Sequence, residues 1–128
     1  MKIDKNLQYS SEHLWVANTE SEELIAGITD YAQDLLGDIV FVEFPKIGAN
    51  LTAGESCGLV ESVKTGSDLH APLDGIVTEV NSSLQVNPEQ INDSPYKTWI
   101  FKFKPTNPDD VKNLMDAYNY EKFIGDIS

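Results

Sequence analysis

Residues 58–81 read GLVESVKTGSDLHAPLDGIVTEVN and contain one strand pattern twice. Each copy begins with glycine and continues with an apolar residue, a valine, two polar residues, a second valine and a last polar residue. The first copy ends at Lys64 and the second at Asn81. Valine-rich runs of this length, bounded by turn formers, are typical of β-strands. The repeat predicts two similar strands related by an internal two-fold, and it is too short for a solenoid unit.

Lys64 lies at the end of the first of these strands. Thr65, Gly66, Ser67 and Asp68 follow it; all are turn formers, and Gly66 is free to adopt a positive φ. We therefore expect Lys64 to project from a β-turn into water. Nothing in the adjacent sequence would bury the amine as a Schiff-base lysine requires. The pattern favours an attachment point over a catalytic lysine, although a turn lysine taken alone is usually a solvated charge.

Short runs rich in Val, Ile, Phe and Trp alternate with turns that contain Gly or Pro, which predicts a mainly β sandwich or barrel. Residues 29–37 break this pattern, because an N-capping threonine and a closing glycine predict a short internal helix. Residues 107–110 read Asn-Pro-Asp-Asp, a capped helix start, and residues 120–124 continue that helix. The expected strands are residues 14–17, 24–27, 39–44, 58–63, 75–80 and 99–103.

The length of 128 residues, 41% of them hydrophobic, suits one compact domain with a sizeable core. We expect a single domain over residues 1–128, with its core at about 23–104 and a C-terminal helical segment at about 107–125. Nine Lys and Arg against 21 Asp and Glu give a net charge of −12. Such a surface repels nucleic acids and anionic membranes, and it favours basic patches on partner proteins.

A few residues indicate the expected cellular location and whether a metal site is expected. The first residues are polar and contain no signal-length apolar run, so the cytoplasm is the expected location. Cys57 is the single cysteine and has no cationic neighbours, so we interpret it as a small strand residue without a disulfide or catalytic role. The only histidines, His13 and His70, have no metal-ligand spacing. No metal is therefore expected.

Residues 60–75 resemble the lipoyl-attachment segment of glycine cleavage H-proteins, whose pattern is close to V-E-S-V-K-A-x-S-D-x-x-[AS]-P-x-x-G. Lys64 falls on the modified position and Glu61 on the acid three residues before it. Thr65 stands where the family usually has Ala, Leu14 stands where many members carry Glu, and the segment from Tyr96 to Trp99 is one residue short. Further matches to family motifs occur at residues 9–16, 27–43, 92–96 and 99–102.

The resemblance implies a lipoyl/biotinyl-type barrel-sandwich hybrid with Lys64 at a hairpin tip. Lipoate in amide linkage to Lys64 would shuttle the aminomethyl group of glycine from a pyridoxal-phosphate glycine decarboxylase to an aminomethyltransferase, in glycine catabolism and one-carbon metabolism. Dihydrolipoamide dehydrogenase would reoxidise the arm, and a lipoate-attaching enzyme would load it. The chain is then a carrier protein and not an enzyme, because the cofactor holds the reactive atoms. The attachment turn is Glu61, Ser62, Val63, Lys64 and Thr65.

The loaded arm is expected to rest against the body of the protein near residues 9–16. The candidates for contact with it are Glu12, His13, Leu14 and Asp68. Because Leu14 replaces the usual acid, we expect Glu12 and Asp68 to supply negative charge and Leu14 to supply apolar cover.

Several other functions are compatible with a turn lysine. A biotinyl domain usually has Met on both sides of the lysine, whereas Val63 and Thr65 flank Lys64. Lipoyl domains of 2-oxoacid dehydrogenases usually show Asp-Lys-Ala and lack both the opening motif and the C-terminal helix. A lipoyl donor that relays the cofactor to other complexes would have the same attachment site. An acidic interaction domain with unmodified Lys64 also remains open.

Overall fold

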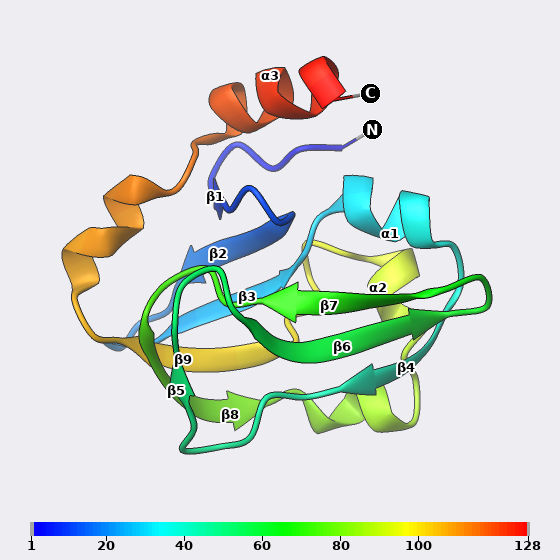
Figure 1. Cartoon of the computed structure of the whole chain (residues 1–128), viewed down its shortest axis with the longest axis horizontal. Coiled ribbons are helices and arrows are strands. Elements are labelled where there is room, and N and C mark those ends of the chain that lie inside the picture. Colours follow the sequence, from blue (N-terminus) through cyan, green and yellow to red (C-terminus); the bar gives the residue numbers. More distant parts are fainter. Residues whose placement is uncertain (1, 128) are drawn as a thin grey trace.

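The computed structural model describes residues 2–127 and contains two antiparallel sheets. One has six strands in the order β1-β2-β3-β9-β8-β5, and the other has three in the order β4-β6-β7 (Figure 1). The strands are β1 (Gln8–Tyr9), β2 (Leu14–Asn18), β3 (Leu24–Ile28), β4 (Ile39–Glu43), β5 (Asn50–Leu51), β6 (Ser56–Ser62), β7 (Gly66–His70), β8 (Gly75–Val80) and β9 (Phe101–Pro105).

The first helix, α1, begins and ends as capping chemistry requires. The Thr29 side chain accepts a hydrogen bond from the backbone N–H of Ala32, and Gly37 ends α1 with a φ of 81°, a conformation that favours glycine. Both capping predictions are confirmed. The helical elements are α1 (Asp30–Leu36), α2 (Gln90–Asp93), α3 (Ala117–Ile127) and the 3-10 helices η1 (Ser82–Gln85) and η2 (Pro108–Asn113).

The C-terminal helical segment differs from the continuous helix expected from residues 107–125. Asn107 caps η2 as predicted, but residues 114–116 separate η2 from α3. Met115 exchanges two backbone hydrogen bonds with Tyr9, each 2.8 Å long. These bonds use the N–H and C=O that a helix would need, and so the helix is interrupted at Met115.

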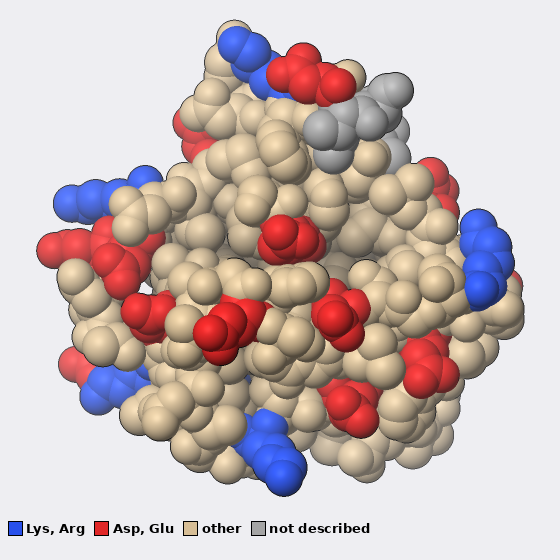
Figure 2. Space-filling view, viewed as in Figure 1, with Lys and Arg blue, Asp and Glu red and all other residues tan. Residues whose placement is uncertain are grey.

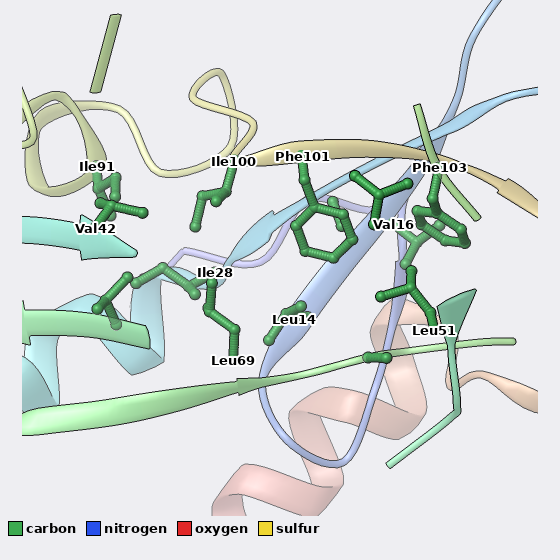
Figure 3. Close-up of a cluster of buried hydrophobic side chains, with 14 of the residues drawn as sticks. Leu14, Val16, Ile28, Val42, Leu51, Leu69, Ile91, Ile100, Phe101 and Phe103 are labelled. Atoms are coloured by element: carbon green, nitrogen blue, oxygen red, sulfur yellow. The ribbon is translucent and has the colours of Figure 1, made fainter. Parts of the chain in front are cut away.

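The main core lies between the two sheets. Leu14 and Val16 point into it from β2, and Phe101 and Phe103 point into it from β9, because alternate residues of a strand share a face. Val42, Val60 and Leu69 close the core from the smaller sheet. Figure 3 shows side chains of both sheets meeting in this layer. The fold class expected from the sequence, mainly β with a short internal helix and a C-terminal helical element, is confirmed.

A second apolar cluster lies outside the main core and contains Tyr9, Trp15 and Tyr120, each at most 1% exposed. Tyr9 and Tyr120 stack with ring centroids 4.5 Å apart. The N-terminal segment and α3 lie side by side above the larger sheet (Figure 1). This cluster therefore joins α3 to the sheet.

The segment after Lys64 was predicted as a turn, and this is wrong beyond residue 65. Gly66 begins β7 and pairs with Glu61 of β6, and it is not among the glycines with positive φ. Hydrogen bonds to β6 extend these turn-forming residues into a strand, so tertiary pairing overrides their local preference. Within residues 2–127, no helix is long and apolar enough to cross a membrane.

Candidate functional site

Strands β6 and β7 form a hairpin (Figure 1). Lys64 lies in its turn, between Ser62 at the end of β6 and Gly66 at the start of β7. Ser62 closes the turn: its Oγ accepts hydrogen bonds from the backbone N–H groups of Lys64 and Thr65, both at 3.1 Å. The backbone N–H of Ser62 donates to the carbonyl of Thr65 at 2.7 Å. Val63, at the tip, is 67% exposed. The turn therefore has a fixed backbone and an exposed lysine, as the sequence predicted.

The tip is also held against the end of α1. The backbone N–H of Val63 donates to the carbonyl of Asp38 at 3.0 Å. A Cβ placed on Gly37 would lie 2.9 Å from Cε of Lys64, so the lysine stem crosses the backbone of Gly37. Sequence reasoning assigned Gly37 only to the helix end and missed this contact, because its positive φ already accounts for the glycine.

Glu61 lies on β6, the central strand of the smaller sheet, opposite Phe41 on one side and Gly66 on the other. Its side chain is exposed, while that of the preceding Val60 points into the core. A Cβ on Gly66 would be 3.7 Å from Cγ of Glu61, so the carboxylate stem lies beside a residue without a side chain. The Glu61 side chain is therefore accessible on the strand that leads into the Lys64 turn.

A cavity of about 110 Å³ lies between α1 and β7, next to the start of β2, and we call it the α1–β7 cavity. The four residues expected to contact the arm, Glu12, His13, Leu14 and Asp68, all line it. Sequence reasoning missed the other lining residues, most of them apolar: Ile28, Ala32, Leu35, Leu36, Val60, Ser67 and Leu69.

The polar groups of the cavity differ in their surroundings. Leu14 is only 1% exposed and belongs to the main core, whereas Glu12 and Asp68 are exposed. Oε2 of Glu12 lies 3.7 Å from Nδ1 of His70. Glu12 also lines a neighbouring open cavity of about 600 Å³, so its carboxylate lies at the boundary between the two cavities. The site thus combines apolar walls with two accessible acids.

His13 is held more firmly than a surface histidine. Its φ is 69°, a value uncommon for a residue other than glycine, and its Nδ1 lies 2.9 Å from the hydroxyl of Tyr120. Burial lowers the pKa of His13, and the nearby Glu12 carboxylate raises it by less. No motif in the sequence connected Tyr120 with this region.

The single cysteine lies within the smaller sheet. Cys57 lies in β6, and burial raises the pKa of its thiol to about 11. It is therefore protonated at neutral pH and is a poor nucleophile. Among the described residues, no three or more His, Cys, Asp or Glu side chains are grouped so as to hold a metal ion.

A family model described as glycine cleavage H-protein matches residues 7–127. The chain belongs to the glycine cleavage H-protein family. The glycine cleavage system H protein of Methylobacillus flagellatus is 59% identical over 125 residues, which cover 98% of this chain and all of that protein. The protein of the same name from Geobacillus kaustophilus is 50% identical over 127 residues, covering 98% and 99%.

The three-dimensional comparison agrees with family membership. The crystal structure of a glycine cleavage system H protein from Mycobacterium marinum superposes with a TM-score of 0.86 at 39% sequence identity. The match covers 96% of this chain and 99% of that one. The H-protein family suggested by the segment around Lys64 is thereby confirmed, and the H-protein fold includes the C-terminal helical element as well as the sheets.

Proposed function

We propose that this chain carries lipoate in amide linkage on Lys64 and shuttles the aminomethyl group of glycine from glycine decarboxylase to aminomethyltransferase. Family membership supports this role, and so does the exposed lysine on a turn that Ser62 closes. When bound, the lipoyl group supplies a dithiolane whose disulfide accepts the aminomethyl group and whose dithiol is later reoxidised by dihydrolipoamide dehydrogenase. The chain itself acts as a carrier and as a substrate of those enzymes.

One observation carries the proposal furthest: all four candidate arm contacts line a single cavity beside the lysine-bearing hairpin. Lys64 crosses Gly37 at the end of α1, and Leu36, one residue earlier, lines the cavity. The apolar walls suit a dithiolane ring, since burying its carbon and sulfur atoms is favourable. The acids Glu12 and Asp68 suit a positively charged amine.

The partners proposed are glycine decarboxylase, aminomethyltransferase, dihydrolipoamide dehydrogenase and a lipoate-attaching enzyme. Figure 2 shows acidic side chains spread over the face that carries β6 and β7, with basic ones toward the outline. Together with the net charge of −12, this favours partners with basic docking surfaces and steers their approach. The cytoplasmic location stays a prediction, as does the single domain with its core at about 23–104.

Glu61→Ala is expected to slow lipoylation in vitro with little change in melting temperature. The carboxylate is exposed near Lys64, and an attaching enzyme must recognise something local besides an exposed amine. Glu55→Ala is the matched control, because Glu55 is exposed just before the other end of β6. The measurement is the initial rate of lipoyl incorporation by mass spectrometry. Equal rates for the two variants would show that Glu61 is only a solvated charge.

Glu12→Gln and Asp68→Asn are each expected to speed formaldehyde release from aminomethyl-loaded protein. An amine one carbon away from sulfur breaks down when its lone pair forms a C=N bond and the C–S electron pair leaves with sulfur. Water then adds to the C=N carbon, which yields formaldehyde and ammonia. A nearby carboxylate keeps the amine protonated and ties up that lone pair. Leu14 contributes only apolar cover, because its side chain is buried.

The control for the two acids is Glu20→Gln, since Glu20 is exposed and does not line the α1–β7 cavity. All variants carry the same loss of one negative charge, so a general electrostatic effect would appear in all of them. Release from the Glu12 and Asp68 variants at the rate of the Glu20 variant would contradict the role of these acids.

A further inference from the structure

A chain of hydrogen bonds joins α3 to the walls of the α1–β7 cavity. The backbone N–H of Ala32 donates to Oγ1 of Thr29 at 3.2 Å. Oγ1 of Thr29 lies 2.8 Å from the hydroxyl of Tyr120, and that hydroxyl lies 2.9 Å from Nδ1 of His13. Tyr120 is fully buried on α3. His13 and Ala32, the two ends of the chain, both line the cavity.

One bond of this chain has a fixed direction, and satisfying both hydroxyls then orders the other two. The N–H of Ala32 can only donate, so Oγ1 of Thr29 accepts there. The other hydrogen bond of the Thr29 hydroxyl within the described residues is with Tyr120, and the Thr29 hydroxyl can use it to donate its own hydrogen. With Thr29 as the donor to Tyr120, the Tyr120 hydroxyl has its own hydrogen left to donate to Nδ1 of His13. This is the order in which each hydroxyl donates once and accepts once, and it leaves the proton of a neutral His13 on Nε2.

The position of the His13 ring is fixed as well. The backbone N–H of His13 donates to Ser10, and its carbonyl accepts from the backbone N–H of Thr29, both at 3.1 Å. The ring packs between Tyr31 of α1 and Phe123 of α3, with centroid distances of 4.9 and 6.0 Å. Burial also favours the neutral imidazole, since it lowers the pKa of His13. The ring therefore has little freedom to turn over.

We propose that Tyr120 is a positioning residue for the arm cavity, which locks His13 in the tautomer that carries its proton on Nε2. Through Thr29, the same hydroxyl is linked to the first turn of α1, which forms another wall of the cavity. Because Nδ1 is occupied by Tyr120, His13 has no free basic nitrogen with which to take a proton from an ammonium group in the cavity. The ammonium group of a loaded arm would thus be protected from deprotonation by His13. This protective consequence rests on the proposed function, whereas the assignment of the His13 tautomer does not.

The test uses Tyr120→Phe, which keeps the stack on Tyr9 but removes the hydroxyl. Imidazole ¹⁵N NMR of the unlipoylated wild type should show an unprotonated Nδ1 and a protonated Nε2 for His13. In the variant both shifts should move toward those of an imidazole that exchanges freely between its two tautomers. Tyr118→Phe is the matched control, because Tyr118 lies on the same helix and is 67% exposed; its spectrum should equal that of the wild type.

Two results would overturn the proposal directly. The first is a wild-type spectrum in which His13 is protonated on Nδ1, and this measurement does not depend on whether any variant folds. The second is a Tyr120→Phe spectrum that is unchanged from that of the wild type. A second readout is formaldehyde release from loaded protein, expected to be severalfold faster in Tyr120→Phe than in Tyr118→Phe. Equal release with a shifted tautomer would overturn the protective consequence. Absence of lipoate from Lys64 would instead contradict the proposed function and leave the NMR result standing.

Discussion

Lys64→Arg is expected to abolish lipoylation, and with it all glycine cleavage that depends on this chain, while the melting temperature stays almost unchanged. The guanidinium cannot be deprotonated in a protein and so offers no nucleophilic nitrogen for amide formation. The side chain of Lys64 is exposed, and substitutions at such positions usually change stability by about 0.5 kcal/mol or less. Loss of function without loss of fold is therefore the expected signature.

The measurement is intact mass, followed by peptide mapping, of protein from cells supplied with lipoate. Wild type should gain one lipoyl group, and Lys64→Arg should gain none. Lys46→Arg is the control, because Lys46 is another exposed lysine that lies outside the β6–β7 hairpin. A lipoyl group mapped to any lysine other than Lys64 would refute the assignment.

Phe101→Ala is expected to lower the free energy of unfolding by about 3–5 kcal/mol, the usual cost of removing a fully buried phenylalanine. Phe101 has no exposed surface and lies in β9, paired with Ala26 of β3 and Val80 of β8. Its ring contacts that of Phe103 at a centroid distance of 5.8 Å. Since domains of this kind are stable by only about 5–15 kcal/mol, a large part of the total would be lost.

Phe41→Ala provides the matched control, because it removes the same ring from β4 at a position that is 49% exposed. Its expected cost is well below that of Phe101→Ala, since a half-exposed ring leaves no cavity in the core. Urea unfolding of both variants gives the comparison. Equal losses would mean that the core between the two sheets is not the main source of stability.

Local chemistry explains most of what could be predicted. Thr29 and Gly37 bracket α1 because a cap and a left-handed end depend only on neighbouring residues. Lys64 was placed at a turn for the same reason, although Gly66 proved to be strand because its pairing with Glu61 is set by β6. The two-residue strands β1 and β5, which sequence analysis missed, are too short to show a periodic pattern.

The candidate site was only partly accessible from sequence. Its members Glu12, His13, Leu14 and Asp68 were named through motif resemblance, not through any local physical signal. Their meeting in one cavity depends on three segments far apart in the chain, the start of β2, α1 and β7. No short-range pattern fixes such a meeting, because it follows from how the two sheets pack.

The sequence by itself determined the mainly β fold, because turn formers, caps and alternating apolar residues act over a few positions. Its motifs indicated the family and led to the proposal of Lys64 as the attachment residue. Only the tertiary structure decided what lies beside the lysine and what lines the α1–β7 cavity. Gly37 lies under the stem of Lys64, and Tyr120 reaches His13 across 107 residues of chain. These contacts form because burying the apolar faces of the sheets and of α3 brings distant backbones together, and the hydrogen bonds of buried polar groups are then completed by whichever groups lie nearby.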